Sequence, residues 1–143
     1  MKAFIYRCRF VWFWGYIALL TYELLLKNPW VILGKEISQN PPLDTHSAPA
    51  SAALHIGSFS VLGILASFAF LEKTEKTRTR YALWLVLYAG LTEAMQTTIP
   101  GRWASGEDVL FNIIGLVCGA LIFQQICRLR KDSSTETLYP IPA

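Results

Sequence analysis

The chain has 143 residues, of which 53% are hydrophobic, and its mean hydropathy is +0.36. Four apolar segments, each about long enough to cross a bilayer, take up half of the chain and exclude a separate soluble domain. The net charge of +3 is spread over short segments beside these runs, which excludes a nucleic-acid surface and favours a topology signal. The cysteines Cys8, Cys118 and Cys127 have no CxxC spacing, so we expect no disulfide framework, no metal site and no cofactor.

The apolar segments predict an all-α integral membrane protein, with four transmembrane helices in an antiparallel bundle. The expected helices cover about residues 10–26, 52–71, 81–99 and 109–127. They form one domain over residues 1–131, and residues 132–143 are expected to be a mobile polar tail. The basic N-terminus and the first apolar run also resemble a signal peptide, but the nearest small residues suited to cleavage lie too far downstream. We therefore expect the first helix to be retained.

The distribution of Lys and Arg predicts the orientation of this bundle. Three basic residues lie before the first helix, four lie in an expected connector at 72–80, and three follow the last helix. With four helices, these ten lie on one side, and Lys27, Lys35 and Arg102 lie on the other. The positive-inside rule then places both termini in the cytoplasm.

Six polar residues lie near the outer ends of three expected helices, where a plain membrane anchor would not need them. They are His55, Glu93, Gln96, Arg102, Asp108 and Asn112. At 1.5 Å per residue, even Glu93 lies only about 10 Å below the outer end of its helix. The sequence therefore predicts one polar site in the outer leaflet.

Helical phase relates several of these residues to a pair of glycines. Asp108, Asn112, Gly115 and Gly119 fall within roughly 60° of one another around the last helix. The two glycines are expected to be packing residues. Glu93 and Gln96 share a face of the third helix. If the glycine stripe packs against that face, Asn112 and Asp108 would lie near Gln96 and Glu93.

Each candidate site residue has a structural alternative. Glu93 is the hardest to explain structurally, because a buried membrane carboxylate is costly unless it is paired or protonated, and its expected partner is Arg102 or His55. Asp108 also fits a capping box that begins at Ser105. The amides could simply hold helices together. The candidates for catalysis are Glu93, His55 and Asp108, and those for ligand binding are Arg102, Gln96, Asn112 and Ser105.

The series of residues from Leu54 to Gly119 resembles the VanZ-like family of small bacterial membrane proteins. The resemblance rests on His55, the E-x-x-Q of Glu93 and Gln96, Pro100-Gly101-Arg102, Ser105, Asp108, Asn112 and the two glycines. Many members of that family carry Asp-Lys where this chain has Ser51 and Ala52. The resemblance implies a multi-pass protein of the bacterial cytoplasmic (inner) membrane, a cell-envelope context and lower susceptibility to the glycopeptide teicoplanin. It implies no particular reaction.

Three functions fit the sequence. In the first, the outer polar site binds or processes an envelope lipid or a lipid-linked precursor: Arg102 holds a phosphate or carboxylate, while Glu93 and His55 transfer protons or position a group. In the second, the protein is a non-catalytic membrane interaction protein whose polar cluster is structural or docks another envelope protein. The third is transport of a small solute or protons through Glu93. We favour the first and leave open whether the protein is an enzyme.

Overall fold

The computed structural model describes residues 2–25, 48–98 and 105–136, and every regular element in these ranges is a helix. A short α1 (Lys2–Arg7) is followed by four long helices. These are α2 (Arg9–Leu25), α3 (Ala48–Ala69), α4 (Glu75–Gln96) and α5 (Gly106–Glu136). The all-α prediction is therefore confirmed.

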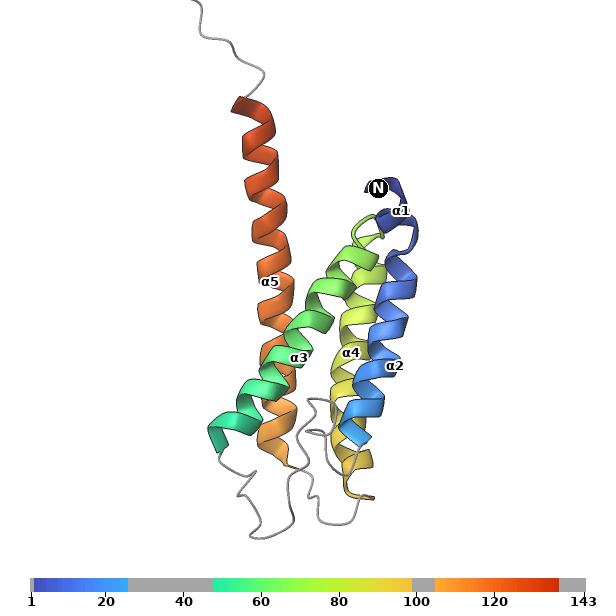
Figure 1. Ribbon diagram of the computed structural model, residues 1–143, viewed down its shortest axis with the longest axis vertical. Coiled ribbons are helices and arrows are strands. Elements are labelled where there is room, and N and C mark those ends of the chain that lie inside the picture. The colour runs from blue at the N-terminus through green and yellow to red at the C-terminus, as the bar shows by residue number, and fades with distance from the viewer. Residues whose placement is uncertain (1, 26–47, 99–104, 137–143) are drawn as a thin grey trace, which may run out of the picture.

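Successive long helices run in opposite directions (Figure 1). The beginning of α2, the end of α3 and the beginning of α4 lie at one end of the bundle, which we call the basic end because three basic segments of the sequence meet there. The end of α2 and the beginnings of α3 and α5 lie at the other end. Helix α3 is inclined to the others, and it crosses from α5 to the α2–α4 pair (Figure 1).

Two helices are long and apolar enough to cross a membrane. Their apolar spans are Ser51–Ala69, with a mean hydropathy of 1.7, and Gly106–Lys131, with a mean hydropathy of 2.0. Most of each span is not buried within the protein, as expected for helices that face lipid rather than a soluble core. That α2 and α4 also cross the membrane, and that both termini are cytoplasmic, remain predictions.

Most helix ends lie within four residues of those expected, and the two largest differences are the beginning of α4 and the end of α5. Helix α4 begins at Glu75 rather than Tyr81, so most of the segment expected to be a connector is helical. Thr74 caps this helix by accepting a hydrogen bond from the Thr77 amide at 3.3 Å, and the Glu75 carboxylate favours the positive end of the helix dipole. Helix α5 continues past Cys127 to Glu136, because Arg, Lys and Glu have good helix propensity. Residues 137–143 of the expected tail lie outside the described residues.

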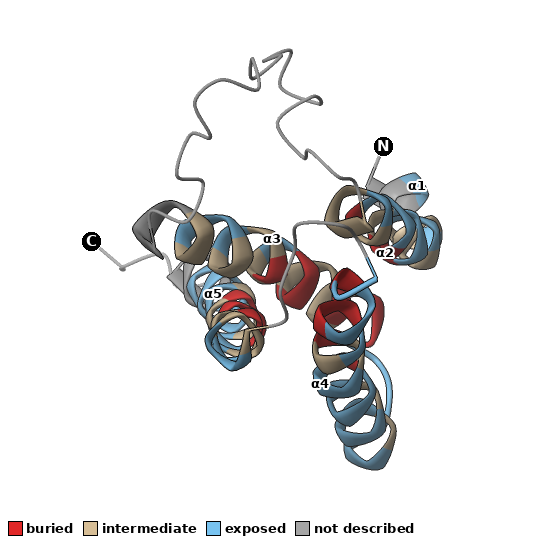
Figure 2. Ribbon diagram, turned by 90° about the horizontal axis from the view of Figure 1, so that it is seen from below, coloured by how far each residue is buried: buried red, intermediate tan, exposed pale blue. Residues whose placement is uncertain are grey.

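The core is a layer of apolar side chains between α2, α3 and α4, with Leu116 contributed by α5. Its members are Phe13, Ile17, Leu20, Phe59, Leu62, Ala66, Ala69, Phe70, Leu85, Ala89 and Leu116. The buried residues lie on the faces that the helices turn toward one another (Figure 2). Large apolar side chains such as Val11, Leu83, Leu87 and Leu121 lie on the outer faces. An apolar exterior around an apolar core suits a protein surrounded by lipid.

Hydrogen bonds from polar side chains attach α2 to its neighbours. The Tyr16 hydroxyl donates to the Ser58 carbonyl of α3 at 2.9 Å. Thr21 and the Tyr88 hydroxyl of α4 form a bond of 2.9 Å. Such bonds between membrane helices contribute about 0.6 kcal/mol on average. They therefore fix how the helices meet more than they determine overall stability.

Glycines allow the backbones of α3 and α5 to come into direct contact. A Cβ atom on Gly115 would lie 2.6 Å from the Ile56 carbonyl oxygen, and one on Gly119 would collide with the Ser60 carbonyl oxygen. The glycine stripe therefore packs on α3, and the condition that it packs against α4 is not met. Phase around one helix predicts which residues share a face, but not which neighbour that face meets.

We predict that Gly119→Ala destabilises the protein by about 1–3 kcal/mol, because its methyl group must push the two backbones apart. Gly57→Ala on α3 is the matched control, since its Cβ would meet nothing within 4 Å. Thermal unfolding in detergent should show a lower melting temperature for Gly119→Ala than for Gly57→Ala. Equal melting temperatures would contradict the proposed contact.

Candidate functional site

His55 is held in position by an amide from another helix. It lies on α3, and its ring nitrogen Nδ1 is 2.8 Å from Oδ1 of Asn112 on α5. The glycine contact between these helices brings the two residues together, because Ile56 of α3 faces Gly115 of α5. Ile56 directly follows His55, and Gly115 lies less than one turn after Asn112. The amide oxygen can only accept a hydrogen bond, so Nδ1 carries the proton in this pair.

Asn112 connects His55 to Glu93. Its side-chain nitrogen donates to Oε1 of Glu93 on α4 at 3.3 Å, while its oxygen accepts from His55. Asn112 is fully buried, and Glu93 is only 2% exposed. A buried amide that uses both its donor and its acceptor fixes the relative positions of three helices. The sequence predicted His55 as one possible partner of Glu93, and it placed Asn112 near Glu93 if the glycine stripe packed against that face of the third helix. It did not predict that Asn112 would bridge Glu93 and His55.

Two carboxylates flank the imidazole. Glu93 Oε1 lies 3.7 Å from His55 Nδ1, and Asp108 Oδ1 lies 3.8 Å from Nε2. The exposed fraction of the side chain increases from Glu93 (2%) through His55 (11%) to Asp108 (21%). A ligand would therefore reach this cluster from the side of Asp108 and Nε2. We call His55, Glu93, Asp108 and Asn112 the polar cluster.

The polar cluster can exchange protons. Because Nδ1 is bound to Asn112, the other ring nitrogen faces the more accessible side and can accept or donate a proton there. If Nε2 is protonated, it points toward the Asp108 carboxylate as a neighbouring acceptor. Imidazole and carboxylate groups are the usual side chains for general acid–base chemistry. Within the described residues, no group of His, Cys, Asp and Glu side chains is arranged to hold a metal ion.

The other candidate site residues have different places. Ser105 caps α5, since its hydroxyl accepts a hydrogen bond from the Glu107 amide at 3.2 Å. Gln96 donates to the Leu24 carbonyl of α2 at 3.3 Å, so it attaches α4 to α2. Ser51 and Ala52 lie one turn before His55 on α3. Arg102, the expected binder of a phosphate or carboxylate, lies outside the described residues.

The fold and the polar cluster define a helical membrane protein with an ionisable site between three helices. The chain matches the model of the VanZ/LLP1 family over residues 10–128, and it therefore belongs to this family of membrane proteins. The match includes α2 and so extends beyond the segment from Leu54 to Gly119. A search of curated proteins finds no match, and a search of solved structures finds none.

We predict an interaction energy of about 0.6–1.7 kcal/mol between His55 and Asn112, the range of hydrogen bonds between membrane helices. A double-mutant cycle with His55→Ala and Asn112→Ala, followed by unfolding in detergent, measures it. The matched cycle pairs His55→Ala with Gln124→Ala, an exposed amide elsewhere on α5, and should give a coupling near zero. Equal coupling in both cycles would show that His55 and Asn112 do not interact directly.

Proposed function

We propose that the polar cluster binds the headgroup of an envelope lipid, or of a lipid-linked precursor, from the outer leaflet. The observation that carries this proposal is the arrangement around His55. Asn112 holds the inner ring nitrogen at 2.8 Å, and the outer nitrogen faces the partly exposed Asp108. A ring that served only to join helices would not need a second nitrogen directed toward the accessible side.

The position of the polar cluster supports the outer leaflet. His55 and Asp108 lie near the beginnings of α3 and α5, at the opposite end of the bundle from the basic end (Figure 1). Under the positive-inside rule, the basic end faces the cytoplasm, and the polar cluster then lies near the outer headgroups. A lipid could place its polar group at the cluster and keep its chains in the bilayer.

The charges of the cluster suggest which residue would contact which chemical group of a lipid headgroup. The described cluster contains two carboxylates and one imidazole, which suit hydroxyl or amine groups of a ligand. A phosphate would need a cation, and Arg102 is the residue we assign to it from the sequence. Glu93 and His55 would then position the headgroup or transfer its protons. Ser51 and Ala52 replace a charged pair found in many relatives, so we expect the ligand to differ within the family.

We predict that Asp108→Asn lowers the amount of co-purifying lipid about tenfold, the loss expected when a charge-assisted hydrogen bond to the ligand is removed. Native mass spectrometry of the detergent-solubilised protein measures the bound lipid. Asp108 is the most exposed carboxylate of the cluster, so this variant should unfold at nearly the same temperature as the wild type. Glu93→Gln should lose the same lipid.

Glu107→Gln is the matched control for Asp108→Asn. Glu107 is an exposed carboxylate in the same first turn of α5. Its replacement by Gln should not change the amount of bound lipid. If Asp108→Asn and Glu107→Gln retain equal amounts of the same lipid as the wild type, the headgroup proposal fails.

The alternative function is that of an interaction protein whose polar cluster is structural. The observation that favours it is the burial of Asn112 and Glu93, because a buried polar network can fix how helices pack without binding a ligand. On this interpretation, Glu93→Gln would lower the melting temperature and no lipid would be specific to the wild type. The lipid measurement and the unfolding measurement together separate the two functions.

Membership of the VanZ/LLP1 family also gives a cellular prediction. Expression of this chain in a glycopeptide-sensitive bacterium should raise the concentration of teicoplanin needed to inhibit growth. Asp108→Asn, at equal membrane abundance, should remove that increase, while Glu107→Gln should keep it. An increase that persists in Asp108→Asn would separate the phenotype from the polar cluster.

A further inference from the structure

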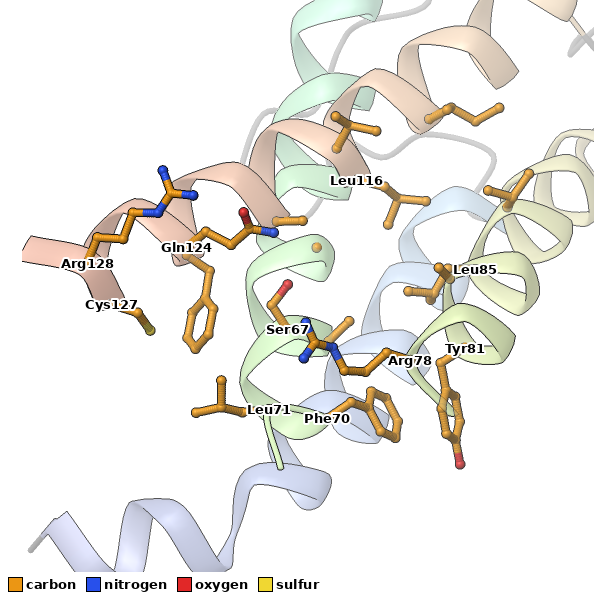
Figure 3. Close-up of a pocket in the computed structure, with 18 residues that line it drawn as sticks. Ser67, Phe70, Leu71, Arg78, Tyr81, Leu85, Leu116, Gln124, Cys127 and Arg128 are labelled. Carbon is orange, nitrogen blue, oxygen red and sulfur yellow. The ribbon is translucent and has the colours of Figure 1, made fainter. Parts of the chain in front are cut away.

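A groove at the basic end has no role in the proposed function. It lies between α4 and α5, its floor is the second half of α3, and its volume is about 510 Å³ (Figure 3). Ligand sites in proteins are typically roughly 300–1,000 Å³. This groove therefore has room for part of a ligand. Its lining on α5 runs from Ile113, directly after Asn112 of the polar cluster, to Arg128 at the basic end.

The walls and the floor of the groove are mainly apolar. Phe70, Leu85 and Leu116 are buried beneath it, while Val86 and Val117 remain 42% and 52% exposed. Helices α4 and α5 meet near the polar cluster through Glu93 and Asn112, but they stand apart at the basic end. An elongated apolar groove of this kind suits a hydrocarbon chain.

Two arginines line the same groove. Arg78 comes from α4 and Arg128 from α5, so the two cations lie on opposite walls (Figure 3). No acidic residue is among the described residues that line the groove. The Arg128 side chain forms no ion pair or hydrogen bond with the described part of the chain. Arg78 pairs at 3.2 Å with Glu75, but both are largely exposed and such a pair holds a guanidinium only weakly.

We propose that this groove binds an anionic phospholipid, with an acyl chain between α4 and α5 and the phosphate held by Arg78 and Arg128. A guanidinium binds phosphate through two parallel hydrogen bonds, and basic pockets between transmembrane helices are typical sites for acidic lipid headgroups. Arg78 lies in the first turn of α4, and Arg128 of α5 lines the same groove as Phe70 and Leu71 at the end of α3. This is the depth at which a headgroup of the leaflet on the basic side would lie.

A second copy of this chain fits the groove less well. In a two-fold dimer the same surface meets itself, so each Arg78 and Arg128 would approach the arginines of the other copy. No acid in the groove lining would offset this repulsion. A lipid phosphate supplies the opposite charge directly.

The test measures the affinity of the full-length protein in detergent for phosphatidylglycerol and phosphatidylcholine with identical chains, by native mass spectrometry. The wild type should bind one phosphatidylglycerol about tenfold or more tightly than phosphatidylcholine, because the second headgroup has no net charge. The double variant Arg78→Gln/Arg128→Gln should lose this preference. Arg7→Gln/Arg80→Gln removes the same charge from exposed positions at the same end, outside the groove, and should keep it.

A further variant tests the groove without changing any charge. Ala120→Phe places a ring in the groove and should exclude the lipid, whereas Ala18→Phe on the exposed face of α2 should not. Asp108→Asn should keep the phosphatidylglycerol preference, so failure of the headgroup proposal is separable from failure of this one. The inference is overturned if the preference survives Arg78→Gln/Arg128→Gln, if both double variants lose it equally, or if Ala120→Phe instead dissociates a dimer.

Discussion

The contact between the backbones of α3 and α5 is the constraint on which the site depends. Gly115 and Gly119 have no side chain, so the carbonyl groups of Ile56 and Ser60 can lie directly against α5. Lipid offers no hydrophobic driving force between helices, and close packing of this kind is what holds them together. His55 precedes this contact on α3, and Asn112 precedes it on α5. The same contact therefore stabilises the bundle and forms the hydrogen bond that orients the imidazole.

Burial explains why the polar cluster is a connected network. A carboxylate such as Glu93 is expensive in the hydrocarbon region unless it is protonated or has polar partners. Asn112 supplies one donor to Glu93 and one acceptor to His55, so a single side chain satisfies two neighbours. The network also leaves Asp108 at its accessible edge. A stable fold and an accessible carboxylate are thus compatible in one small cluster.

Much of the fold could be predicted from the sequence, because hydropathy and spacing report on one helix at a time. They predicted an all-α chain, and they placed His55, Glu93, Asp108 and Asn112 near one another in depth. They did not predict that α5 packs on α3, since nothing within a helix identifies its neighbour. They also missed the first turns of α4, which begin at Glu75. Hydropathy does not distinguish a charged helical segment from a charged connecting loop.

The two ends of the bundle differ in the chemistry they offer. The polar cluster is small and closely packed and contains two carboxylates, an imidazole and an amide, whereas the groove is open, mainly apolar and lined by two cations. Helix α5 runs continuously through both, with Asn112 in the first and Arg128 in the second. The groove lining on α5 begins at Ile113, beside the glycine contact, and it includes Leu116, whose carbonyl group lies against Gly63 of α3. A change in how α5 packs on α3 would therefore alter both sites.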